Sequence, residues 1–198
     1  RLLTVTGVQT CALPISLMLA EHALQVLEES DQLVSAEAVL AALDRLGQEI
    51  THAFGRCNPL LLVVMRGGLY FAGQLLPRLQ FPLDLDYIHA TRYGDATSGG
   101  QLQWKVEPTA QVSGRHVLVL DDILDGGDTL AEIQQRLLAL GAASVQSAVL
   151  TDKQHGRPKP IAADFVGLAL PDRYVFGCGM DVSGAWRNLS AIHAMKDS

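Results

Sequence analysis

The order of apolar and polar residues switches repeatedly between a helical period and the pattern of buried strands. Helical spacing extends over residues 16–30, 35–54, 69–79 and 129–140. Strand-like runs cover residues 59–65, 83–93, 101–108, 116–120, 144–153, 164–170 and 173–180. Strands that alternate with helices along the chain indicate an α/β fold with a mainly parallel sheet.

One domain accounts for this pattern. We find no internal repeat and no linker, so residues 16–198 are expected to form a single domain. Ser35, followed by Ala36 and Glu37, has the residue types of a helix cap with an acidic first turn. Residues 1–15 fit neither period and are treated as a tail that is non-native or disordered.

Composition narrows the class of protein. The chain has 198 residues, of which 48% are hydrophobic and 18% charged, as is usual for a globular protein. A net charge of -6 argues against a nucleic-acid partner, and the apolar runs are too short to span a membrane. The three cysteines lack metal-ligand spacing, which favours a reducing, cytoplasmic location.

The candidate chemistry lies in one stretch, VLVLDDILDGGDTL, at residues 117–130. Asp121 and Asp122 follow an apolar strand, and ligands of open α/β sheets bind at the carboxyl ends of strands. The glycine turn at residues 125–129 then opens a helix, whose backbone N–H groups suit a phosphate. Carboxylates for sugar hydroxyls or magnesium beside a phosphate cradle predict a site for a phosphorylated sugar. The alternative is an acidic turn that merely caps a helix.

This stretch resembles the phosphoribosyl-diphosphate (PRPP) signature of type I phosphoribosyltransferases. The segments MRGG, ATRYGD, LTDK, ADFVGLALPDRYVFGCGMD and WRNL are similar in order and spacing to the hypoxanthine-guanine branch, from about residue 17 onward. The resemblance implies a mainly parallel twisted sheet flanked by helices, with a small hood formed by the N- and C-terminal segments. It also implies a homodimer or homotetramer.

The resemblance assigns the sugar-phosphate site residue by residue. Asp121 and Asp122 would hold the ribose hydroxyls, partly through Mg²⁺, and Asp125 would be the general base at purine N7. The peptide between Met65 and Arg66 would be cis. The other residues implied to contact PRPP or the nucleotide are Arg66, Gly67, Gly68, Tyr93, Ile123, Leu124, Gly126, Gly127, Asp128, Thr129 and Arg187.

The purine pocket implied by the resemblance consists of Lys153, Tyr174, Val175 and Asp181, with Asp181 also a ligand of Mg²⁺. The Lys153 ammonium is only a donor, so it suits the C6 carbonyl of a 6-oxopurine and mismatches the amino group of adenine. Taken without the resemblance, Lys153 would be an exposed lysine after a strand and Tyr174 a core aromatic residue.

The implied activity transfers the 5-phosphoribosyl group from PRPP to hypoxanthine or guanine, giving IMP or GMP and pyrophosphate, with Mg²⁺ as cofactor. Alternatives are a preference for xanthine, or a regulatory protein that keeps this fold. Residues 92–101 have the composition of a lid, or of a plain hairpin loop. Two residues depart from the family pattern: Gly126 lacks a side-chain donor, and the charge of Asp128 would repel a phosphate unless it points into water.

Overall fold

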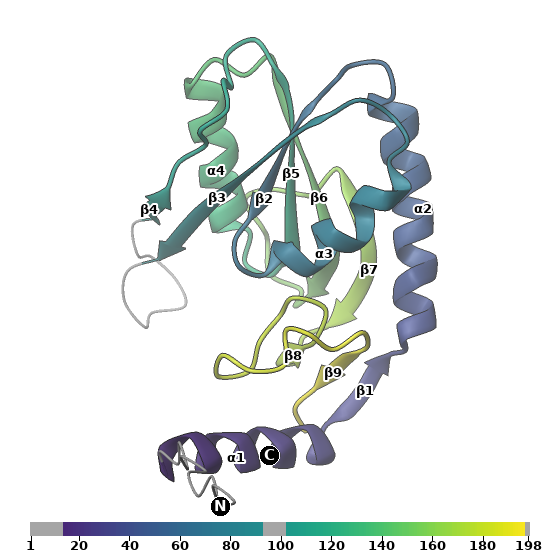
Figure 1. The fold of residues 1–198 in the computed structure, drawn as a ribbon, viewed down its shortest axis with the longest axis vertical. Helices are drawn as coiled ribbons and strands as arrows, with labels where there is room; N and C mark the ends of the chain where they lie inside the picture. Colours follow the sequence, from purple (N-terminus) through teal and green to yellow (C-terminus); the bar gives the residue numbers. More distant parts are fainter. Residues whose placement is uncertain (1–13, 93–101, 197–198) are drawn as a thin grey trace, which may run out of the picture.

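A twisted six-stranded sheet forms the centre of the protein in the computed structural model, which describes residues 14–92 and 102–196 (Figure 1). The strand order is β4-β3-β2-β5-β6-β7, and only β4 runs antiparallel to its neighbour. The strands are β2 (Leu60–Val64), β3 (Asp84–Arg92), β4 (Leu102–Val106), β5 (His116–Leu124), β6 (Ser144–Gln154) and β7 (Phe165–Pro171). The predicted α/β fold with a mainly parallel sheet is confirmed.

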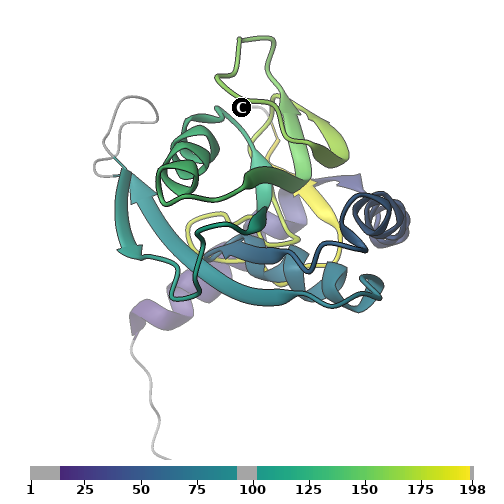
Figure 2. The ribbon, with the colours of Figure 1, turned by 90° about the horizontal axis from the view of Figure 1, so that it is seen from above.

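Helices cover both faces of this sheet (Figure 2). On one face lie α2 (Ala36–Phe54) and α3 (Gly68–Leu75), which continues into a 3₁₀ turn, η1 (Leu76–Arg78). On the other face lies α4 (Asp128–Ala139). All five residues of β2 are buried, which explains its unbroken apolar sequence. The predicted cap is confirmed, because the Ser35 hydroxyl accepts a hydrogen bond from the Ala38 N–H at 3.3 Å.

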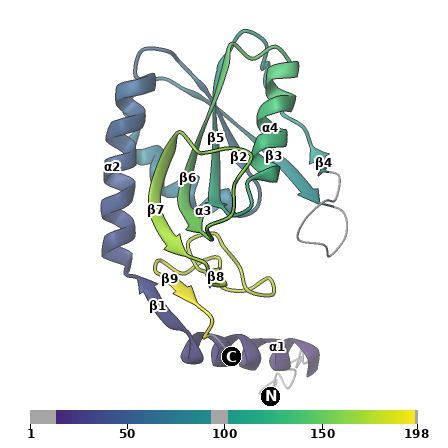
Figure 3. The same ribbon diagram turned by 180° about the vertical axis from the view of Figure 1, so that it is seen from behind.

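A small second sheet forms a hood beyond the carboxyl ends of the parallel strands (Figure 3). Its order is β1-β9-β8, with β1 (Asp31–Val34), β8 (Val175–Phe176) and β9 (Ile192–Ala194). Helix α1 (Pro14–Glu29) lies next to it, held by a 2.7 Å hydrogen bond from the Trp186 indole N–H to the Ala23 carbonyl. The hood therefore combines N- and C-terminal segments, as the resemblance implied.

Several predicted boundaries were wrong. The strand predicted over 116–120 continues to Leu124, because main-chain pairing with β6 persists through Leu124 and Asp152. The strand predicted over 173–180 is reduced to Val175–Phe176. The chain then turns through Gly177 and Gly179, both at positive φ. The predicted tail lies outside the described residues except for its last two positions, which begin α1. In the described ranges no helix is long and apolar enough to cross a bilayer.

Candidate active site at the carboxyl edge of the sheet

The two acids of β5 lie where the strand has a neighbour on one side only. Pairing with β2 ends at Leu120, opposite Val63, whereas pairing with β6 continues through Asp121 to Leu124. The end of β2 thus leaves space beside the acids. Asp122 is 8% exposed and Asp121 is partly buried.

Both carboxyl groups are poorly solvated. Burial raises the pKa of Asp121 well above its usual range, and the neighbouring charge of Asp122 raises it further. Burial also raises the pKa of Asp122, although the nearby Arg187 opposes this increase. A pair of acids with raised pKa values in a recess is typical of a site that gains from a bound cation.

The loop after β2 passes so close to these acids that only glycine fits. A Cβ atom on Gly67 would lie 1.9 Å from the Asp122 Oδ2, and one on Gly68 would lie 2.7 Å from the Leu120 carbonyl oxygen. The peptide between Met65 and Arg66 is cis, as the resemblance implied. The backbone of this loop therefore lies directly against the Asp122 carboxylate.

The hood segment after β8 contacts the same loop through Gly179, which is bonded to Arg187. A Cβ on Gly179, whose φ is +107°, would lie 2.2 Å from the Gly67 carbonyl oxygen. The Arg187 guanidinium donates to the Gly179 carbonyl at 2.6 Å and forms an ion pair with the Asp181 Oδ1, also at 2.6 Å. Arg187 and Asp181 are thus brought together, and Asp181 also accepts the Gly184 N–H at 2.7 Å.

A cavity of about 350 Å³ opens above the acids and holds two basic residues that the sequence did not reveal, His89 and Lys105. Lys105 is the unpaired residue of a β-bulge, since His89 pairs with Val106 and Ala90 with Trp104. Burial, with the charges of Lys105 and Arg66, lowers the pKa of His89. The cavity is lined by Val64, Met65, Arg66, Gly67, His89, Lys105, Asp121, Asp122 and Arg187. Strand pairing was the missing signal, because bulges are not visible in the sequence.

A second cavity of about 550 Å³ lies at the start of α4. Gly127 has a φ of +88° at the helix N-cap, a backbone conformation that favours glycine. Asp128 is exposed, as expected, but its Oδ2 lies 3.6 Å from the position of a Cβ on Gly126, so its charge remains beside the turn. The lining residues are Asp125, Gly126, Gly127, Asp128, Thr129, Lys153, His155, Arg157, Pro158, Pro160 and Asp172.

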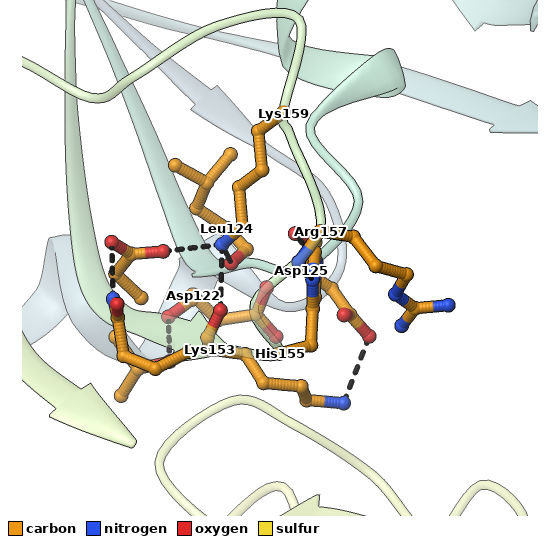
Figure 4. A network of polar contacts seen from close by, with 10 residues as sticks. Asp122, Leu124, Asp125, Lys153, His155, Arg157 and Lys159 are labelled. Atoms are coloured by element: carbon orange, nitrogen blue, oxygen red, sulfur yellow. Dashed lines mark hydrogen bonds and ion pairs between the residues drawn. The ribbon is translucent and has the colours of Figure 1, made fainter. Parts of the chain in front are cut away.

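Two residues with predicted roles in this cavity contact each other. The Lys153 ammonium lies 2.9 Å from the Asp125 Oδ2, although 28 residues separate them (Figure 4). His155 lies 3.1 Å from the Asp125 carbonyl oxygen through Nε2, and its Nδ1 accepts the Arg157 N–H. His155 and Arg157 were missed, although both follow closely after the LTDK motif.

The remaining predicted residues lie apart from the two cavities. Tyr174 is exposed in the hood, where its hydroxyl donates to the Asp181 carbonyl at 3.3 Å, and Val175 is buried in β8. Leu124 is buried and Ile123 is partly buried, so both would face a nucleotide only through their main chain. Tyr93 and the loop sequence after Arg92 lie outside the described residues.

Comparisons with known proteins agree with this arrangement. The model of the phosphoribosyl transferase domain matches residues 29–183. The hypoxanthine-guanine phosphoribosyltransferase of Streptococcus pneumoniae R6 is 32% identical over 166 residues, which are 83% of this chain and 92% of that protein. The Bacillus subtilis protein of the same name is 33% identical over 165 residues, with the same coverage.

Solved structures lead to the same family. A hypoxanthine phosphoribosyltransferase from Staphylococcus aureus superposes with a TM-score of 0.80 at 28% identity, over 84% of this chain and 91% of that one. A hypoxanthine-guanine-xanthine phosphoribosyltransferase superposes with a TM-score of 0.78 at 28% identity, over 86% of this chain and 99% of that one. With the acids, the glycine loop and the Lys153–Asp125 pair on one edge of this fold, the chain belongs to the phosphoribosyltransferase family, in its hypoxanthine-guanine branch.

Proposed function

We propose that the protein transfers the 5-phosphoribosyl group of PRPP to N9 of a 6-oxopurine, hypoxanthine or guanine, and releases pyrophosphate. The observation that carries this proposal is the 2.9 Å contact between the Lys153 ammonium and the Asp125 carboxylate in the second cavity. A 6-oxopurine offers an O6 acceptor next to N7, which carries a proton in the reacting base. One donor beside one acceptor is the complement of that edge.

The pair also explains discrimination and proton transfer. Adenine presents an amino group at C6, which would leave the Lys153 ammonium facing another donor. Asp125 would accept the N7 proton while the new bond forms at N9, and its partly exposed carboxylate would exchange its contact with Lys153 for one with the base. Tyr174 would stack on the purine, Val175 would contact its edge through the main chain, and Asp181 would complete the pocket.

The first cavity suits the diphosphate and ribose of PRPP. Its cationic residues, Arg66, Lys105 and Arg187, would bind the leaving pyrophosphate, and the main chain of Gly67 and Gly68 would approach it closely. Asp121 and Asp122 would accept the ribose hydroxyls. The turn from Gly126 to Thr129 would hold the 5-phosphate through backbone N–H groups and the Thr129 hydroxyl. The remaining predicted contacts are Asp128, which lines the second cavity, and Ile123, Leu124 and Tyr93, which would contact the nucleotide.

The carboxylates of Asp121, Asp122 and Asp181 are suitable ligands for Mg²⁺. Within the described residues no three acidic, histidine or cysteine side chains form a metal-binding group, but Mg²⁺ commonly uses one or two carboxylates with substrate phosphate oxygens and water. Asp121 and Asp122 provide two such carboxylates with raised pKa values, and Asp181 provides one that is now paired with Arg187. When bound, Mg²⁺ would neutralise the diphosphate and help it to leave.

We propose four further properties of the chain. Residues 92–101, of which 93–101 lie outside the described residues, would act as a lid that keeps water from the site, with Tyr93 contacting PRPP. Residues 1–15 would be dispensable. We place the protein in the cytoplasm because Cys57 and Cys178 are free. A homodimer or homotetramer is supported by Leu85 and Tyr87, which are 52% and 46% exposed on β3 and leave an uncovered apolar strip.

A direct test incubates the purified protein with PRPP, Mg²⁺ and each of hypoxanthine, guanine, xanthine and adenine, and follows nucleotide and pyrophosphate. We expect IMP or GMP with stoichiometric pyrophosphate, dependence on Mg²⁺ and no AMP. Faster turnover of xanthine than of the other two bases would favour the xanthine alternative. Absence of turnover with any base would favour a regulatory protein and contradict the proposal.

A further inference from the structure

Lys159 makes more contacts than a surface lysine. Its ammonium donates to the Leu124 carbonyl at 2.8 Å, the Asp152 Oδ1 at 2.5 Å and the Lys153 carbonyl at 2.8 Å (Figure 4). These three bonds use all the donors that an ammonium has. The side chain is only 15% exposed, and the three surrounding acceptors compensate the ammonium for the water that it loses on burial.

Two of the three acceptors belong to the last residue pair between β5 and β6, and the third belongs to the next residue of β6. Leu124 pairs with Asp152, and each residue immediately precedes one member of the proposed catalytic pair. Asp125 follows Leu124, and Lys153 follows Asp152. Lys159 therefore bonds to both strands at the point where they present the carboxylate and the ammonium that are 2.9 Å apart.

The segment that carries Lys159 is stiff. Pro158 and Pro160 flank it, and proline fixes its own φ and restricts the residue before it. Both prolines line the second cavity, whereas the Lys159 side chain points back to the strand ends. The same contact thus fixes one wall of the cavity relative to its floor.

We propose that Lys159 is a positioning residue that sets the distance between the Asp125 carboxylate and the Lys153 ammonium, and thereby the fit of the 6-oxopurine edge. This inference rests on the proposed function, because the pair matters only if it binds the base. Without the Lys159 ammonium, the Leu124 and Lys153 carbonyls would lose a buried donor, and Asp125 and Lys153, which follow the last β5–β6 pair, would shift relative to each other. PRPP bound near Asp121 and Asp122 would be affected much less.

Arg45 offers a matched control. Its guanidinium also bonds two main-chain carbonyls, those of Val166 at 3.0 Å and Gly167 at 2.6 Å, but on β7 and away from both cavities. Replacing Arg45 or Lys159 by Met in separate variants removes a cationic clamp from the sheet and keeps an unbranched side chain. A merely structural role for Lys159 would make the two variants behave alike.

The test measures steady-state kinetics and melting of Lys159→Met, Arg45→Met and the unmodified protein, well below the lowest melting temperature. We expect Lys159→Met to lower kcat/KM for hypoxanthine by roughly 10- to 100-fold, with KM for PRPP within about twofold, as for a misplacement near 1 Å. Arg45→Met should lower the melting temperature but leave the kinetics for both hypoxanthine and PRPP unchanged. Asp152→Ala, which removes one acceptor, should also lower kcat/KM for hypoxanthine with little change in KM for PRPP, but by a smaller factor. This variant replaces Lys159→Met in the test if Lys159→Met does not fold.

Two results would overturn the inference: hypoxanthine kinetics within twofold of the unmodified protein, or parallel losses for both substrates in Lys159→Met. If the unmodified protein turned over no 6-oxopurine, the proposed function would fail first. Binding of IMP would then test the role of Lys159 separately. If Lys159 positions the pair, Lys159→Met must bind IMP more weakly than Arg45→Met does. Equal binding by the two variants would contradict it.

Discussion

The contact between Gly67 and Asp122 allows the position of one carboxylate to be tested without removing it. Gly67 has φ −60° and ψ −47°, which suit alanine, so Gly67→Ala should not distort the backbone. The added Cβ would nevertheless lie 1.9 Å from the Asp122 Oδ2 and 2.3 Å from its Cγ. Non-bonded carbon and oxygen atoms need about 3.5 Å, so the carboxylate must move by roughly 1.5 Å.

A shift of this size predicts a large kinetic effect. Displacement of a positioning group by about 1 Å can cost roughly 100-fold, which is about 2.7 kcal/mol of transition-state stabilisation. We therefore expect Gly67→Ala to lower kcat/KM for PRPP by about 100-fold or more, and to reduce the rise in melting temperature caused by PRPP with Mg²⁺.

Gly73, in the helix that follows Gly67, provides the control, because nothing lies within 4 Å of a Cβ at that position. Gly73→Ala should leave the kinetics unchanged and stabilise α3 by up to about 1 kcal/mol. Steady-state kinetics against PRPP and thermal melting of the two variants decide the matter. Normal PRPP kinetics in Gly67→Ala would refute the assignment of Asp122 to the sugar-phosphate site.

Three further substitutions separate the roles of the acids. Asp125→Asn should lower kcat by roughly 10²–10⁴ with little change in KM for PRPP; an equal fall in PRPP affinity would contradict its role as base. Burial raises the pKa of Asp122, so ionisation of this carboxyl group destabilises the folded protein as the pH rises above about 4. Asp122→Asn removes this cost and should raise the melting temperature, measured without ligand, at pH 7 but not at pH 4. It should also raise KM for PRPP. Asp128→Asn should lower KM for PRPP about three- to tenfold, because it removes the repulsion between the Asp128 carboxylate and the 5-phosphate at about 6 Å in water. An unchanged KM would show that the charge is fully screened.

Local patterns predicted most of the sheet but not its exact edges. The buried run before Asp121 and the cap at Ser35 depend on neighbouring residues, and both were predicted correctly. The hood strands β1 and β9 have only 4 and 3 residues, too few for a period, and they form because distant segments pair. Likewise, the place where β5 loses its partner depends on the length of β2.

Within the site, residues named by a contiguous motif could be predicted, whereas those recruited by tertiary packing could not. Asp125 and Lys153 came from two motifs, and the structure joins them at 2.9 Å. Lys105 reaches the first cavity through a bulge, and Lys159 reaches the strand ends from a loop. Both look like ordinary surface lysines in the sequence, because no local pattern shows that Lys105 lines a cavity or that the Lys159 side chain is largely buried.

We propose that Lys153 beside Asp125 selects a 6-oxopurine as acceptor of the phosphoribosyl group. The most direct measurement is the ratio of kcat/KM for hypoxanthine to kcat/KM for adenine, with saturating PRPP and Mg²⁺. Sites that would leave a buried polar group unpaired reject the wrong substrate by about 10⁴-fold, so we predict a ratio of at least about 10³. A ratio near 1, in a protein active on both bases, would contradict the account.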